Sequence, residues 1–238
     1  MSFVIAVLSP YSHDVIFCSE GKELLLWLGE TEINEETTEL VRDDFIKTLA
    51  LNAHVCIGFG GKVRSIRAFL EKILPELPWH ECTPKDAPTN FVESFAIMNG
   101  PDILDVSLAG CRESIIEFLN SSEADCAEGL KPILGGSDGN RPALYSFPRD
   151  KGRYQYKHTE LAYGVPTDFS PSDDWPTLDN IVHHSVNLHN LRHRAAEELC
   201  MEALELVADQ AYSCNKNITF RRLSKGFTEE GREIVVRE

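Results

Sequence analysis

The stretch KPILGGSDGNRPALYSFPRDKGRYQYKHTELAYG, residues 131–164, decides the fold class. Its first two apolar runs, 131–136 and 142–147, flank the turn-forming residues Ser137-Asp138-Gly139-Asn140, and a second turn follows at 150–152. Short apolar runs separated by Gly, Asp and Asn are typical of antiparallel strands. The pattern therefore predicts three strands in meander order.

The N-terminal part of the chain repeats this alternation of apolar runs and turn residues. It predicts five further strands, at 3–8, 15–19, 23–28, 46–51 and 54–59. The first two form a hairpin, the last two form another strand pair, and an acidic, Thr-rich loop runs from the third strand as far as Leu40.

Helical spacing of apolar residues appears in three places. The first is residues 62–74, which follow Gly60-Gly61 and end before Pro75. The second is predicted within parts of 89–121, after a proline-rich loop. An acidic linker at 165–180 precedes 188–212, which has the best helix composition in the chain and leads to a final strand at 217–223. The order of elements predicts one α+β domain over 1–238, with two antiparallel sheets held between helix layers.

The charge balance excludes several partners. With 23 Lys and Arg against 38 Asp and Glu, the net charge is 23 − 38 = −15, which disfavours binding to nucleic acid or to an anionic membrane. No apolar run approaches the roughly 20 residues that cross a bilayer, and the N-terminus lacks a basic signal region. We expect a cytoplasmic protein. Its seven cysteines, without a CxxC pair, are expected to be reduced thiols.

Three segments resemble proteasome-type subunits: KTLALNAHVCIGFGG at 47–61, the meander at 131–164, and ALELVADQAYSCNKNITFRRLSKGF at 203–227. The match covers most of the chain except about 76–128, an atypical Pro-rich helical segment. The resemblance is to β-type and bacterial protease subunits. It implies a four-layer αββα sandwich of the N-terminal nucleophile hydrolase class, a peptide or protein substrate, no cofactor, and self-assembly into a ring-type homo-oligomer.

The resemblance also implies a catalytic centre. Ser2 matches the terminal nucleophile once the initiator Met is removed, and its α-amine, with an ordinary pKa near 8, would act as general base. Lys47 matches the lysine that supports the nucleophile, 14 positions before Gly61, which matches the glycine that donates its N–H to the oxyanion.

Two supporting positions complete the implied site, and others depart from the family. Glu20 stands where the family has an Asp that orients the lysine, and Ser213 matches the serine of the AYS turn. The family's Asp before that turn is Gln210 here, next to Asp209, and its Gly-Ser-Gly becomes Gly164-Val165-Pro166. These departures leave open an alternative function, that of a catalytically inactive structural subunit in an oligomer.

A histidine cluster offers a competing interpretation. The residues are His183, His184, His189 and His193. The i, i+4 pair His189 and His193 has a spacing that can ligate zinc or nickel, but no nearby signature completes the ligand set, so we expect no metal site. The chain also lacks a GxSxG elbow, and the run at 58–61 lacks the pattern of a phosphate-binding loop.

Overall fold

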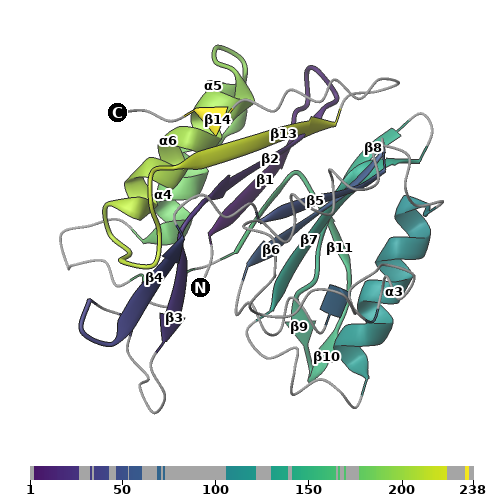
Figure 1. Ribbon diagram of the computed structural model, residues 1–238. Helices are drawn as coiled ribbons and strands as arrows, with labels where there is room; N and C mark the ends of the chain where they lie inside the picture. The colour runs from purple at the N-terminus through teal and green to yellow at the C-terminus, as the bar shows by residue number, and fades with distance from the viewer. Residues whose placement is uncertain are drawn as a thin grey trace.

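The structure is a computed structural model of a mixed α+β protein whose described strand pairs are all antiparallel (Figure 1). It describes residues 3–26, 33, 35–42, 47–52, 54–60, 69–70, 72, 106–121, 130–138, 141–164, 166, 169, 177–223 and 234–235. Two five-stranded sheets make up most of it, and two smaller strand pairs project from them.

The first sheet has the strand order β12-β1-β2-β13-β14. Its strands are β1 (Val4–Leu8), β2 (Val15–Glu20), β12 (Leu161–Tyr163), β13 (Ile218–Leu223) and β14 (Ile234–Val235). The predicted N-terminal hairpin is confirmed, with Ile5 opposite Cys18. The strand predicted as final is present as β13 but is not the last one, because the short β14 pairs with its first residues, Ile218 and Thr219.

The second sheet has the order β11-β8-β7-β6-β5. Its strands are β5 (Thr48–Asn52), β6 (Val55–Gly60), β7 (Lys131–Asp138), β8 (Arg141–Ser146) and β11 (Lys157–Thr159). The predicted β5–β6 pair is confirmed. A short hairpin of β9 (Arg149–Asp150) and β10 (Arg153–Tyr154) extends from this region.

Two strand predictions need correction. The segment expected to be a loop as far as Leu40 overlaps β4 (Thr38–Arg42), which pairs with β3 (Glu23–Leu26). The sequence TELVR contains β-branched and apolar residues that favour a strand, but the acidic residues around it masked this signal. The third meander strand is divided at Glu160: β11 pairs with β8 in the second sheet, whereas β12 pairs with β1 in the first. A single bent residue thus carries the chain from one sheet to the other.

Strand β1 is apolar throughout because it is covered on both faces. Phe3, Ile5 and Val7 contact a cluster that includes α4 and α6, whereas Val4 and Ala6 belong to a cluster between the two sheets. This alternation is the period of two that a strand imposes on its side chains. A third cluster lies between the second sheet and α3.

The ring of Phe17 explains two glycines of the second sheet. A Cβ added to Gly135 would come within 2.6 Å of Val15 and 2.8 Å of the Phe17 ring, and one added to Gly58 would come within 2.9 Å of Val4 and 3.1 Å of that ring. The sheets therefore approach closely only because these positions lack side chains. Burying an aromatic side chain of this size contributes about 3 kcal/mol.

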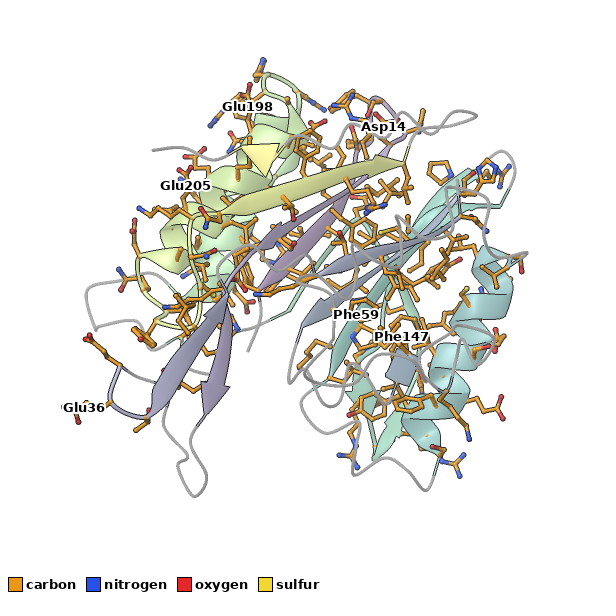
Figure 2. All side chains as sticks on the ribbon, viewed as in Figure 1. Asp14, Glu36, Phe59, Phe147, Glu198 and Glu205 are labelled. Carbon is orange, nitrogen blue, oxygen red and sulfur yellow. The ribbon has the colours of Figure 1, made fainter. Side chains whose placement is uncertain are left out.

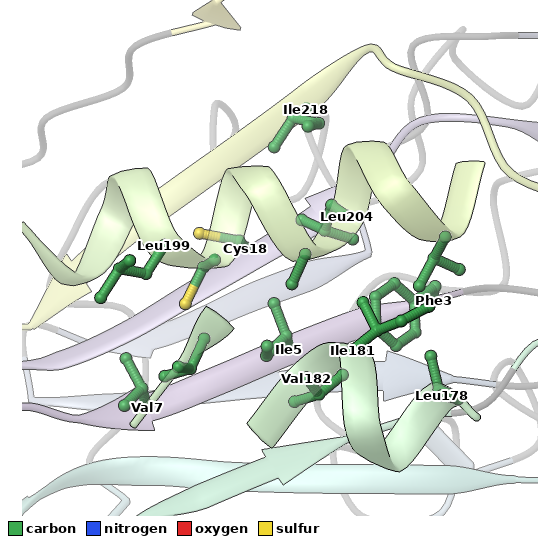
Figure 3. Packing of buried hydrophobic residues seen from close by; sticks show 14 of the residues in the cluster. Phe3, Ile5, Val7, Cys18, Leu178, Ile181, Val182, Leu199, Leu204 and Ile218 are labelled. Atoms are coloured by element: carbon green, nitrogen blue, oxygen red, sulfur yellow. The ribbon is translucent and has the colours of Figure 1, made fainter. Parts of the chain in front are cut away.

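Four helices have full bounds: α3 (Leu108–Asn120), α4 (Leu178–Ser185), α5 (Leu188–Leu191) and α6 (Ala196–Ala208). Figure 3 shows α4 and α6 packed on β1 and β2, with Leu199 and Leu204 of α6 facing Cys18, Ile5 and Phe3. Figure 1 places α3 on the opposite side of the molecule, against the second sheet.

The helix predictions hold in part. The long helix predicted at 188–212 is two helices, because Asn187 caps α5 and its successor begins only at Ala196. The linker predicted at 165–180 ends early, since Thr177 caps α4. Within 62–74, Phe69, Leu70 and Lys72 are helical and the rest lies outside the described residues.

Two further findings concern the expectations from composition. None of the helices in the described ranges is long and apolar enough to span a membrane. Five cysteines are described, and all are buried and free: Cys18, Cys56, Cys111, Cys200 and Cys214.

Candidate functional site

The ends of four strands meet at one edge of the two sheets. Phe3 precedes β1 and lies beside Glu20, the last residue of β2, whose N–H donates to the Phe3 carbonyl at 3.4 Å. Lys47 precedes β5 and lies beside the end of β6, because the Phe59 N–H donates to the Lys47 carbonyl at 2.9 Å. The first pair belongs to one sheet and the second pair to the other.

A buried ion pair joins these strand ends. The Lys47 ammonium donates to Oε1 of Glu20, and the two side chains are 1% and 0% exposed, respectively. The backbone N–H of Phe3 donates to the same oxygen at 3.1 Å, and the N–H of Lys22 donates to Oε2 at 2.7 Å. Both carboxylate oxygens are therefore satisfied, as a charge removed from water requires.

The Lys47 ammonium has a second acceptor. It donates to the backbone carbonyl of Lys22 at 2.8 Å, so the turn after β2 holds it from one side while Glu20 holds it from another. Two directional contacts fix the position of an otherwise flexible side chain. The arrangement therefore holds one ammonium group, paired with the carboxylate of Glu20, next to the start of β1.

The loop that carries Ser213 supports this turn. Asn215 Oδ1 accepts from the Gly21 N–H at 2.9 Å. The Lys22 ammonium donates to the Tyr212 carbonyl and lies 3.7 Å from the centre of the Tyr212 ring. Ser213 itself is fully buried between these contacts. The loop after α6 therefore reaches Lys47 indirectly, through Gly21 and Lys22.

The structure describes some of the positions at which the sequence departs from the proteasome-type pattern. Asp209, next to Gln210, pairs with Lys216 at 2.6 Å on the surface, where both side chains are about half exposed. Gly164 keeps a structural contact, since its N–H donates to the Val4 carbonyl at 2.8 Å. Val165 lies outside the described residues.

Two of the five expected site residues, Ser2 and Gly61, also lie outside the described residues. Each is one peptide bond from a described residue: Ser2 precedes Phe3, and Gly61 follows Gly60 at the end of β6. Of the other three, Glu20 and Lys47 are in direct contact, and Ser213 lies in the supporting loop.

Sequence reasoning missed Lys22 and Asn215. The contribution of Lys22 to the ion pair comes from its backbone carbonyl and N–H, which carry no side-chain signal. Asn215 offered a clue, since Asn in a turn commonly bonds a nearby backbone group, although its partner here is 194 positions away in the chain.

The histidine pair keeps its proximity without forming a metal cluster in the described ranges. The rings of His189 and His193 are 5.1 Å apart, edge to face. Nowhere in the part of the chain that is described do three or more His, Cys, Asp or Glu side chains gather in a way that would hold a metal ion.

Comparison with protein-family models gave no match to this chain, and no curated protein sequence matches it either.

Proposed function

We propose that the chain is an N-terminal nucleophile hydrolase that cleaves peptide or amide bonds, with Ser2 as nucleophile after removal of Met1. The observation that carries the proposal is the buried Lys47–Glu20 pair, to which the N–H of Phe3 is bound directly. A positive charge held beside the start of the chain favours the ionised form of a nucleophile placed there.

The fold proposed with this function is the four-layer αββα sandwich in a single domain. Three separate apolar clusters support it: one between α3 and the second sheet, one between the two sheets, and one between the first sheet and α4 with α6. Three buried interfaces are what four stacked layers require.

In the proposed reaction, Ser2 Oγ attacks the carbonyl carbon of the substrate, and its proton passes to the α-amine of the same residue. The Gly61 N–H donates to the oxyanion, and the Lys47 charge favours the alkoxide at the terminus. The carbon–nitrogen bond breaks as the α-ammonium returns the proton to the leaving amine. Water then hydrolyses the Ser2 ester, which frees the acid product and restores the hydroxyl.

The mature N-terminus provides the first test. Intact-protein mass spectrometry is expected to show loss of Met1, and a β-lactone probe is expected to add to Ser2. Ser2→Ala and Lys47→Ala should abolish the labelling, whereas Ser12→Ala, a change at an exposed serine, should not. Retention of Met1, or labelling that survives Ser2→Ala, contradicts the mechanism.

The alternative is an inactive subunit that keeps the fold and the assembly surfaces. The observation that favours it concerns Glu20, whose side chain is longer than that of the family's Asp. Both of its carboxylate oxygens already accept hydrogen bonds within the protein, and these bonds could serve stability without any role in catalysis. An unlabelled protein with an intact Ser2 terminus and ring-sized mass would support this alternative. Under either function we propose a cytoplasmic, self-associating protein without a nucleic-acid or membrane partner.

A further inference from the structure

One segment of this acidic chain carries the opposite charge. Residues 141–158 contain five Lys and Arg and one Asp, a net of 5 − 1 = +4 in a chain of −15. All five cationic residues of the segment are exposed. The segment forms β8, the β9–β10 hairpin and β11, which is an edge strand of the second sheet.

Aromatic rings of this segment contact two guanidinium groups, one from α3 and one from the segment itself. The guanidinium of Arg112, which also pairs with Glu113, lies 4.2 Å from the centre of the Tyr156 ring, and that of Arg149 lies 5.7 Å from the Tyr154 ring. Tyr156 is nevertheless 46% exposed. We call this surface the basic face; it comprises Arg112, Arg149, Arg153, Tyr154, Tyr156 and His158.

The hairpin of the basic face is also bound to α3. The side-chain amide of Asn120, at the end of α3, donates to the Tyr154 carbonyl and accepts from the Tyr154 N–H, both at 2.9 Å. These two bonds anchor the backbone of the hairpin to α3, and a segment that is already held in place loses less conformational entropy when a partner binds.

The opposite charge is concentrated on α6. Residues 195–210 contain five Asp and Glu and no Lys or Arg. A shallow hollow on this helix is lined by Glu198, Met201, Glu202 and Glu205 together with Arg194. Arg194 pairs with Glu198 at 3.6 Å and with Glu202 at 2.6 Å, so one cation stands against three carboxylates and the hollow keeps a net charge of 1 − 3 = −2. We call these four residues of α6 the acidic face; Figure 2 shows Glu198 and Glu205 projecting from α6 away from the sheets.

We propose that the basic face of one copy docks onto the acidic face of a second copy. In one molecule the two faces lie on opposite sides, with α6 against the first sheet and the β9–β10 hairpin beyond the second (Figure 1), so they do not neutralise one another within a chain. A contact between two different faces repeats from copy to copy and closes into a ring or extends as a filament.

The composition of the basic face favours a protein partner over nucleic acid. Tyr and Arg are the residues most enriched at the centres of protein interfaces. The rest of the chain is strongly acidic and would repel a phosphate backbone, whereas each further copy supplies the complementary surface at equal concentration. The proposal rests on the self-assembly part of the proposed function and is independent of hydrolysis.

Charge reversal in two matched variants tests the contact by sedimentation velocity at low salt. One variant is Arg149→Glu with Arg153→Glu, and the other is Glu198→Lys with Glu202→Lys. Each alone places like charges opposite one another and should weaken association about 100-fold or more. A single chain that carries all four changes restores opposite charges at every contact, whatever the number of copies, and should recover the oligomer. Arg141→Glu, at the far end of β8 from the hairpin, is the control and should assemble as wild type does.

Three outcomes overturn the proposal: a wild-type protein that is monomeric at every concentration, double variants that keep the wild-type mass, or a fourfold variant that does not reassemble. Binding of a fluorescent single-stranded oligonucleotide by a monomeric wild type, lost in the Arg149 and Arg153 variant, would assign the basic face to nucleic acid instead. Circular dichroism of each variant shows that it is folded. A failed β-lactone experiment leaves these masses unchanged, so hydrolysis and assembly are tested separately.

Discussion

The ammonium of Lys47 and the carboxylate of Glu20 form a fully buried ion pair that links the two large sheets at one edge. Neither charge reaches solvent, and each is held by a further contact with the turn at Lys22. Such a pair contributes little net stability compared with apolar residues of the same volume, but it is costly to break from one side only. The pair is therefore expected to matter for stability mainly when only one of its partners is removed.

Removal of Lys47 alone should destabilise the protein strongly. Lys47→Met leaves the Glu20 carboxylate buried without its counter-charge, and we expect the free energy of unfolding to fall by about 3–5 kcal/mol. Urea denaturation measures this change.

The double variant Lys47→Met with Glu20→Leu is the matched control. It removes both charges and should recover part of the lost stability, although the N–H groups of Phe3 and Lys22 lose their acceptor, while probe labelling of Ser2 should remain absent. Equal stability of Lys47→Met and wild type would show that the pair is not isolated from water.

Asn215→Ala should lower the rate of probe labelling without breaking the ion pair. The change removes the acceptor for the Gly21 N–H and loosens the turn that presents the Lys22 carbonyl to Lys47. We expect a loss of about 1 kcal/mol in stability. The control is Asn190→Ala in α5, away from this turn, which also removes an Asn hydrogen bond, the one to the His184 carbonyl. A labelling rate that falls equally in both variants would contradict a positioning role for Asn215.

Local sequence patterns predicted the strands that are bounded by turn residues, but they did not predict which strand belongs to which sheet. The hairpin at Val4–Glu20 and the β5–β6 pair follow from apolar runs bounded by turn residues. The division of the third meander strand at Glu160 does not, since membership of a sheet depends on a partner 150 or more positions away, such as Ile5 for Tyr163. Alternation within a strand is a local property, and pairing is not.

The candidate site shows the same limit. The resemblance to a family implied the contact between Lys47 and Glu20, and the two side chains do meet. The backbone of Lys22 holds both of them, and a loop almost 200 positions further along the chain holds the neighbouring Gly21. A backbone carbonyl is present at every residue, so only the fold selects the one that Lys47 uses.

Gly136→Ala should be far more damaging than Gly110→Ala. A Cβ at Gly136 would lie 2.2 Å from the backbone carbonyl oxygen of His54, which accepts from the Ser137 N–H at 2.9 Å, so β6 and β7 would have to separate. At Gly110, in the first turn of α3, the nearest atom is the Ser107 hydroxyl oxygen at 3.2 Å. Differential scanning calorimetry should show a loss of about 2 kcal/mol or more for the first change and, for the second, an effect within about 1 kcal/mol. Similar melting temperatures for the two variants would contradict the close approach at His54.

The thiol of Cys56 should make the protein less stable as the solution becomes alkaline. Burial between the sheets raises its pKa from 9.0 to about 12. Above pH 9 the thiol ionises in the unfolded chain but not in the folded one, so the unfolded state loses a proton and is favoured. The stabilisation is complete below about pH 9 and is lost as the pH rises towards 12, by about 1.4 kcal/mol per pH unit.

Urea unfolding of wild type and Cys56→Ala at about pH 8, 9.5 and 10.5 measures this slope, which should be smaller in the variant by one proton. Cys111→Ala provides the comparison: burial raises the pKa of Cys111 only to about 11, so by about pH 10.5 its contribution to the slope should already be smaller than that of Cys56. Parallel slopes for wild type and Cys56→Ala would mean that this thiol meets solvent in the folded state.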